Sequence, residues 1–234
     1  MKRMRVFLLV VAVVLIALFF AGVFKRPSPD IQPVVVEPEG PYVTIVLDPG
    51  HGGRDPGAVA GDILEKDVNL AIVERLKNLA ELEPRLNPIL TRTADVTVDK
   101  LDRIHLADEV EAALYLSVHI NAFGDPEVHG VETWIDDTRT PGDPSYLLAE
   151  SVQDALVDAT GARDRGVRSQ GLYLQHTTLP AVSVEVGFLT CPEERTKLLD
   201  SAYQDQIAQG ILKGILNYLD TVGAFEEPVE TGQH

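Results

Sequence analysis

The stretch from Val46 to Ala58 contains the residue with the clearest chemical potential, His51. An apolar, β-branched run ends there in Asp48-Pro49-Gly50, a strong turn signal, and the following loop is rich in glycine. His51 is therefore expected just beyond the C-terminal end of a buried strand, where open α/β sheets bind their ligands. Glycine on both sides removes bulk, so that another group can approach the imidazole closely. A histidine that merely caps a turn is the alternative, and this context argues against it.

Glu65 and His119, which come later in the chain, can join His51 in a metal site. Glu65 begins a predicted helix, where the helix dipole also favours an acidic residue, so its position alone favours a capping role. The short loop from His51 lets both side chains reach one point. His119 ends the apolar strand 114–118, a position that a structural role explains poorly. Two histidines and a carboxylate, with a fourth position open, are typical of hydrolytic rather than structural zinc.

A second carboxylate, Glu185, lies inside the apolar run 182–189. A carboxylate in a buried strand is costly unless it is paired or hydrogen-bonded. One interpretation is a structural salt bridge to Arg92 or Arg103. The other is a general base whose pKa is set by burial and by the metal.

Further polar residues have weaker signals. Asn121, two residues after His119, is expected to orient that histidine or to contact substrate. Arg92 is expected to support the site from behind, to form an ion pair at the edge of the core, or to contact substrate. The remaining histidines have no partner spacing of their own and are assigned no role: His105, His129, His176 and His234.

The elements that must position these residues alternate between strands and helices. Apolar periodicity predicts strands over 43–48, 87–91, 113–119, 130–135 and 181–186. It predicts helices from Glu65 to about residue 79, and over 99–111, 145–159, 192–200 and 203–219. This alternation is typical of an α/β fold, with a mostly parallel central sheet of about six strands and helices on both faces.

Composition excludes some classes of function. The chain has 234 residues and a formal net charge of −16, which argues against nucleic acid as a partner because phosphate contacts need clustered Lys and Arg. Cys191 is the single cysteine, so neither an intramolecular disulfide nor a thiolate zinc site can form.

The N-terminus predicts a membrane anchor. A basic start precedes Val6 to Phe24, an uncharged apolar run about 28 Å long as a helix. We expect an uncleaved signal-anchor over 1–26, with removal as a signal peptide the alternative, and the bulk of the chain outside the cytoplasm. A proline-rich tether over 27–41, a catalytic domain over 42–222 and a disordered tail over 223–234 follow.

Four blocks in order resemble the zinc-dependent N-acetylmuramoyl-L-alanine amidases of the Amidase_3 family. The blocks are Leu47-Asp48-Pro49-Gly50-His51-Gly52-Gly53, Glu65-Lys66-Asp67-Val68-Asn69-Leu70, Ser117-Val118-His119-Ile120-Asn121-Ala122 and Val184-Glu185-Val186-Gly187-Phe188-Leu189. The resemblance extends from about Val43 to Leu219. It implies that His51, Glu65 and His119 hold Zn²⁺ and that Glu185 is the catalytic carboxylate.

The resemblance also implies a substrate and a location. The substrate would be peptidoglycan, cleaved at the amide between N-acetylmuramic acid and L-alanine, in a bacterial cell envelope with the membrane as a further partner. Some relatives carry a helical insertion that blocks the zinc; residues 121–171 leave little room for one, so we expect a site open without an activator, while a protein regulator is not identified. Two alternatives stay open: a zinc peptidase acting within the stem peptide, and an inactive, tethered wall-binding protein.

Overall fold

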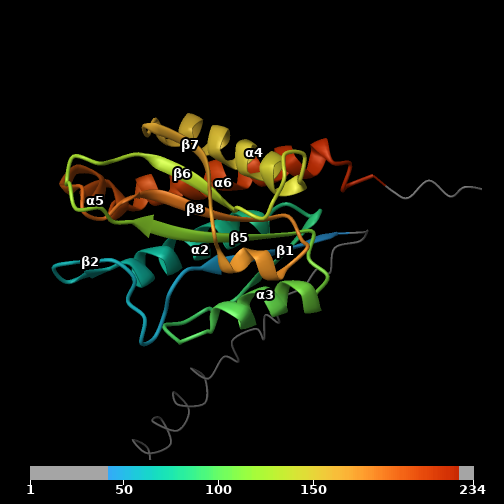
Figure 1. Ribbon diagram of the computed structural model, residues 1–234, viewed down its shortest axis with the longest axis horizontal. Helices are drawn as coiled ribbons and strands as arrows, with labels where there is room; N and C mark the ends of the chain where they lie inside the picture. The colour runs from blue at the N-terminus through green and yellow to red at the C-terminus, as the bar shows by residue number, and fades with distance from the viewer. Residues whose placement is uncertain (1–41, 227–234) are drawn as a thin grey trace, which may run out of the picture. The chain divides into compact units, whose positions relative to one another are not determined.

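The computed structural model describes residues 42–226, which form a six-stranded sheet with helices on both faces (Figure 1). The strand order is β4-β1-β5-β8-β6-β7, and every neighbouring pair is parallel except β6 and β8. The strands are β1 (Val43–Pro49), β4 (Leu86–Leu90), β5 (Leu114–Asn121), β6 (Val131–Asp136), β7 (Asp164–Gln170) and β8 (Ala181–Phe188). The predicted α/β fold is confirmed.

Alternation along the central strands divides the core between the two faces of the sheet. Ile45 and Leu47 of β1 pack on one face with α2 (Glu65–Ala80), α4 (Pro144–Thr160) and α6 (Ser201–Thr221). Val46 points to the opposite face, which α3 (Lys100–Glu109) and the short 3₁₀ helix η1 (Tyr173–His176) cover in part. The first face buries most of the apolar side chains, so the second is left free for polar groups at the C-terminal ends of the strands.

The predicted helices and strands appear within a few residues of their expected bounds, and the differences are short or polar elements. β7 was not expected, because the sequence Asp164–Gln170 is an exposed edge strand without apolar alternation. The small antiparallel pair β2 (Val59–Ala60) and β3 (Ile63–Leu64) and the helix η1 are also too short to give a periodic signal. The two helices predicted at the end of the domain are α5 (Pro192–Leu198) and α6.

The described residues can be compared with the expected limits of the domain. Residues 223–226 of the expected tail are described, and Phe225 packs against the core with the guanidinium of Arg85 4.1 Å above its ring centroid. The expected anchor (1–26), the tether (27–41) and the rest of the tail (227–234) lie outside the described residues. Within 42–226, none of the helices has the length and apolar character that crossing a bilayer requires.

A helical insertion that could block the site would lie between β5 and η1. In the described chain the one helix there before η1 is α4. This helix packs against β6, β7 and α6, on the face of the sheet opposite to α3 and η1. It therefore does not lie over the C-terminal ends of β5 and β8 on the α3 side.

Gly214 of α6 gives a test of the packing between α4 and α6. A Cβ atom at this position would lie 2.5 Å from Val152 Cα and 2.7 Å from Ser151 O, both backbone atoms. Helix propensity alone favours Gly214→Ala by about 1 kcal/mol, but overpacking costs about 1–3 kcal/mol. We therefore expect the variant to unfold at lower denaturant concentration than wild type. Gly124→Ala, at a position with open space, is the control. An equally stable or more stable Gly214→Ala protein would contradict the packing shown here.

Candidate active site

Strand register brings the predicted site residues into one row across the sheet. Gly50 N donates to Val118 O at the end of β1, and His119 of β5 lies beside Glu185 of β8. Glu185 is in turn paired with Glu132 of β6. Because neighbouring residues in a sheet share a face, these side chains lie on the α3 side of the sheet, near the C-terminal ends of the parallel strands.

Glu65 is the centre of a cluster with His51 and His119. Its Oε1 atom lies 3.2 Å from His51 Nε2 and 3.1 Å from His119 Nδ1. One ligand atom from each residue lies within 4.8 Å of the other two, so the three can hold one metal ion. The three predicted ligands are therefore brought together, although they come from a loop, the first turn of α2 and β5.

Backbone and amide donors fix the Glu65 carboxylate in this position. Ile120 N donates to Oε1 over 3.0 Å and Ala58 N to Oε2 over 2.7 Å. Asn69, one turn later in α2, donates to Oε1 over 3.2 Å. Burial alone would raise the pKa of Glu65, but hydrogen bonds and charges from His119 and His51 outweigh it and hold the pKa well below its ordinary value. Glu65 is therefore ionised throughout the physiological range, as a metal ligand must be.

His51 is held in a backbone conformation that side-chain-bearing residues seldom adopt. Its φ is 62°, in the left-handed region. Its Nδ1 lies 2.8 Å from Asp55 Oδ2, which leaves Nε2 to face Glu65. Burial by itself would lower the pKa of His51, but the hydrogen bonds and charges of Glu65 and Asp55 outweigh it and the pKa is raised. Asp55 therefore both orients the imidazole and increases its basicity.

Two buried arginines hold the carbonyl groups of the loop that contains His51. Arg92 donates to Pro49 O over 2.8 Å and to Gly50 O over 3.0 Å. Arg103 donates to His51 O over 2.7 Å and forms a buried ion pair with Asp48. Of the roles considered for Arg92, the structure shows support of this loop from behind. No ion pair joins either arginine to Glu185 within residues 42–226, so the predicted alternative of a structural salt bridge there is wrong.

Gly50 makes room for His119 rather than for an external ligand. A Cβ atom on residue 50 would lie 2.2 Å from His119 Cε1 and 2.5 Å from Nε2. The imidazole of His119 therefore occupies the space that a larger residue at position 50 would fill. This contact explains one of the glycines of the loop by close approach and not by backbone conformation.

Glu185 is the one carboxylate of the row without compensating partners in the described part of the chain. Its Oε2 atom is buried and accepts no hydrogen bond there. Burial, with smaller contributions from the charges of Glu65 and Glu132, raises the pKa of Glu185 to about 7, although His119 and His51 act in the opposite direction. A carboxyl group with this pKa can accept and return a proton near neutrality.

Asn121 contacts Glu132 rather than His119. Its Nδ2 donates to Glu132 Oε1 over 2.7 Å, and Trp134 Nε1 and Arg165 Nε also donate to this carboxylate. No hydrogen bond from Asn121 to His119 is present among the residues that the structure describes, so the predicted orienting role is not the one observed. The fully paired Glu132 contrasts with its unpaired neighbour Glu185.

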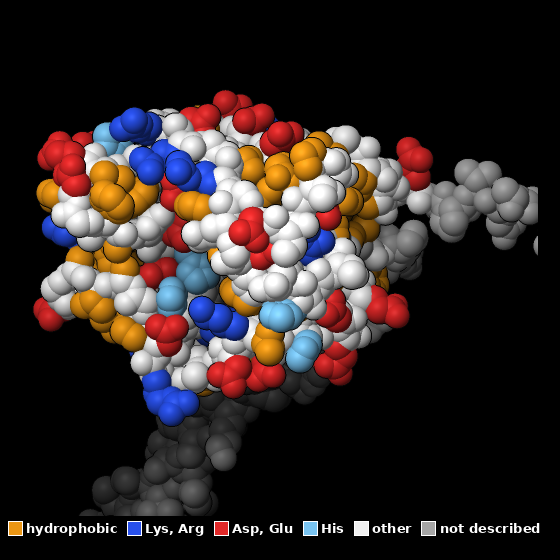
Figure 2. All heavy atoms as spheres, in the orientation of Figure 1, with side chains coloured by type: hydrophobic (Ala, Val, Ile, Leu, Met, Phe, Trp, Pro, Cys, Tyr) orange, Lys and Arg blue, Asp and Glu red, His pale blue; other side chains and the backbone are white. Residues whose placement is uncertain are grey.

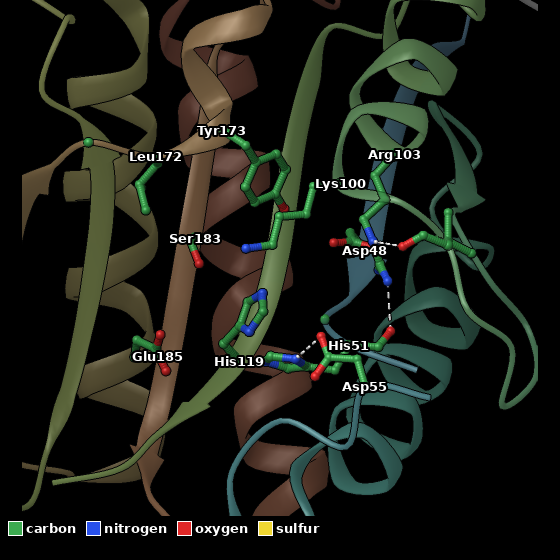
Figure 3. A pocket seen from close by; sticks show the side chains of 13 residues that line it. Asp48, His51, Asp55, Lys100, Arg103, His119, Leu172, Tyr173, Ser183 and Glu185 are labelled. Atoms are coloured by element: carbon green, nitrogen blue, oxygen red, sulfur yellow. Dashed lines mark hydrogen bonds and ion pairs between the residues drawn. The ribbon is translucent and has the colours of Figure 1, made fainter. Parts of the chain in front are cut away.

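A cavity of about 300 Å³ opens beside this row and contains the two histidines and Glu185 in its wall. Figure 2 shows histidine side chains in a hollow of this face, with acidic and basic groups around it. In Figure 3 the labelled side chains of His51, His119 and Glu185 approach the cavity from one side, and Lys100 and Tyr173 from the other. A substrate can therefore reach the candidate metal site directly.

Comparisons with known proteins agree with this geometry. The family model described as Amidase_3, N-acetylmuramoyl-L-alanine amidase, matches residues 45–217. The chain belongs to the Amidase_3 family.

Relatives of this family differ in length while sharing the domain. N-acetylmuramoyl-L-alanine amidase LytC of Bacillus subtilis is 37% identical over 176 residues, covering 75% of this chain and 35% of LytC. The germination-specific N-acetylmuramoyl-L-alanine amidase of the same organism is 35% identical, covering 76% of this chain and 81% of that protein. The crystal structure of an N-acetylmuramoyl-L-alanine amidase from Clostridium difficile 630 has a TM-score of 0.74 and 36% identity, covering 78% of this chain and 99% of that one.

Several residues of this Amidase_3 site were missed by sequence analysis. Asp55 could have been found, because it follows His51 by four residues in the same loop. Glu132 could also have been found as a polar residue in an apolar strand, the signal that identified Glu185. Lys100 and Tyr173 had no such signal, since their approach to the site depends on how α3 and η1 cross the sheet.

Gly50→Ala tests the arrangement of the candidate metal ligands. The three atoms nearest to the added Cβ all belong to the ring of His119, so we expect the domain to fold while the ring is displaced. Affinity for a divalent metal such as zinc should fall about 10- to 100-fold, measured by calorimetric titration of the apoprotein. Circular dichroism checks the fold, and Gly124→Ala serves as the control. Unchanged metal affinity would show that His119 is not a ligand.

Glu185→Gln tests the raised pKa in the metal-free protein. The folded protein holds the Glu185 proton more tightly than the unfolded chain does, so wild type loses stability as pH rises from about 4.5 through about 7. Because glutamine does not titrate, the variant does not lose stability in this way as pH rises. At pH 8, in chelator, we expect it to be more stable than wild type by up to about 3 kcal/mol, with the difference vanishing near pH 4. Urea unfolding at both pH values measures this. A difference that does not change with pH would contradict it.

Proposed function

We propose that the protein is a zinc-dependent hydrolase that cleaves the amide between N-acetylmuramic acid and L-alanine in peptidoglycan. The observation that carries the proposal is the convergence of His51, Glu65 and His119 beside Glu185, whose Oε2 lacks a partner in the described chain. The named activity of the Amidase_3 relatives supports the same bond and the same substrate. Because the chain spans about a third of LytC, this activity is proposed for the domain itself.

The donor set fits zinc. Two imidazole nitrogens and one carboxylate oxygen are the ligands of many catalytic zinc sites, which keep a fourth position open. Glu65 Oε1 accepts hydrogen bonds from His51 Nε2 and His119 Nδ1. A bound cation would take the place of these protons and bind the lone pairs of the same three atoms. The hydrogen bond that His51 Nδ1 donates to Asp55 is the kind of support that metal-bound histidines have. When bound, zinc would supply Lewis acidity, polarising the amide carbonyl and acidifying the attacking water.

Glu185 is proposed to move the proton. As a carboxylate with a pKa near 7, it takes a proton from the attacking water and later returns it to the nitrogen of the departing L-alanine. No partner within residues 42–226 competes for its buried Oε2. The buried position, beside His119 on the neighbouring strand, fixes the carboxyl group on the same face as the ligands.

The relatives also bear on where the protein works. Amidases that act on the cell wall work outside the cytoplasm, and we propose the same for this protein. Attachment to the membrane through residues 1–26 is part of this proposal, as is a site that needs no activating protein. No protein partner is identified.

Digestion of purified peptidoglycan tests the function. We expect release of L-alanine amino termini with the glycan strands intact, and loss of release in the presence of a chelator that zinc restores. New amino termini belonging to other stem residues would favour a zinc peptidase instead. Binding to peptidoglycan without any release, in zinc-loaded protein, would favour an inactive wall-binding protein.

Glu185→Gln tests the catalytic carboxylate. Removing the general base should lower turnover of peptidoglycan by a factor of about 10²–10⁴, while the protein still binds zinc in one-to-one ratio. Elemental analysis and product release are measured on the same sample. Glu193→Gln, an exposed glutamate of α5, is the matched control and should keep wild-type turnover. Wild-type turnover by Glu185→Gln would remove this residue from the mechanism.

A further inference from the structure

The cavity beside the metal site has a second end, formed by α3 and η1. Lys100, Leu172 and Tyr173 line it, and Figure 3 shows them at the opposite side from His51 and His119. In Figure 3 the ammonium group of Lys100 points toward the space between Tyr173 and His119. Its Nζ lies 5.9 Å from the centroid of the Tyr173 ring. The cavity therefore has a cationic end as well as a metal-binding end.

Lys100 is the cation of this cavity that lacks a carboxylate partner within residues 42–226. Arg103 is neutralised by Asp48 in a buried ion pair, and Asp55 is paired with His51. No hydrogen bond or ion pair of Lys100 is present in the same part of the chain, where its side chain is exposed. The cavity walls therefore leave one positive charge free to bind a ligand.

The position of Lys100 in the helix α3 does not itself favour a basic residue. It is the first residue of the helix, directly after the N-cap Asp99. The helix dipole makes this end positive, so a lysine here is slightly unfavourable and an acidic residue would be preferred. Its aliphatic part is not buried either, because the side chain is exposed.

We propose that Lys100 binds a carboxylate in the peptide part of the substrate and so determines which end of the substrate enters the cavity. This rests on the proposed function. On the acyl side of the scissile amide the substrate is a neutral N-acetylated sugar, whose lactyl carboxyl group is consumed in the amide. Free carboxylates occur only on the peptide side. A cation next to the metal site therefore attracts the peptide, and the glycan leaves the cavity in the other direction.

The size of the cavity agrees with this orientation. About 300 Å³ is at the lower end of the range for small-molecule sites, enough for one or two amino-acid residues and too small for a glycan chain. The ligand class is a short peptide with a free carboxylate close to L-alanine.

Lys100→Gln, studied in the full-length protein, tests the proposal with two matched substrates. Both are N-acetylmuramoyl dipeptides beginning with L-alanine; the second residue carries a free α-carboxylate in one and a carboxamide in the other. We expect kcat/KM for the carboxylate substrate to fall about tenfold, mainly through KM, and that for the carboxamide substrate to stay unchanged. Lys100→Arg should keep most of the preference. Lys213→Gln, an exposed lysine of α6, is the control.

The two free dipeptides provide a readout that does not depend on turnover. Calorimetry with zinc-loaded protein should show tighter binding of the carboxylate dipeptide by wild type, and equal binding of both dipeptides by Lys100→Gln. Equal losses on both substrates, or no loss on either, would overturn the proposal. If wild type cleaves neither substrate, the proposed function fails, and the binding preference alone then supports or overturns the role of Lys100.

Discussion

The buried carboxylate of Glu65 is the constraint on which the rest of the site depends. An ionised group away from water must be matched by donors, and Glu65 has five: two imidazoles, two backbone amides and Asn69. These donors come from the glycine-rich loop, from α2 and from β5. Meeting them all at once fixes three segments that are distant in the sequence, and the same geometry forms a candidate metal site.

The two faces of the sheet differ in how completely helices cover them. Helices α2, α4 and α6 cover one face with apolar side chains, and this face supplies most of the core. The other face is covered only in part by α3 and η1, so polar residues at the C-terminal ends of the strands stay accessible. Asp48, Arg92 and Arg103 form the boundary between them, because their buried charges hold the backbone of the loop that carries His51. Stability on one face thus supports strained geometry and unpaired charge on the other.

Glu132 and Glu185 show how neighbouring positions on two strands acquire different roles. Glu132 accepts from Asn121, Trp134 and Arg165, and its charge is compensated. Glu185 has a buried oxygen without a partner in the described chain, and its pKa is raised. The hydrogen-bond partners of these two neighbouring carboxyl groups therefore differ, and the pKa of the one with an unpaired oxygen in the described chain is raised.

The fold class, most helices and strands, and the four residues at the centre of the candidate site could be predicted from the sequence alone. The signals of three of them are local, because His51, His119 and Glu185 interrupt or end apolar strands. The position of Glu65 alone favours a capping role, and the short loop from His51 and the resemblance to the family add it to the site. Contacts between distant segments determine that Arg92 holds backbone carbonyls, that Asn121 contacts Glu132, and that Lys100 faces the cavity. The edge strand β7 was also not predicted, because its mostly exposed, polar residues carry no periodic pattern. Such features depend on strand order and on which helix crosses which face, and these are set by contacts between residues far apart in the chain.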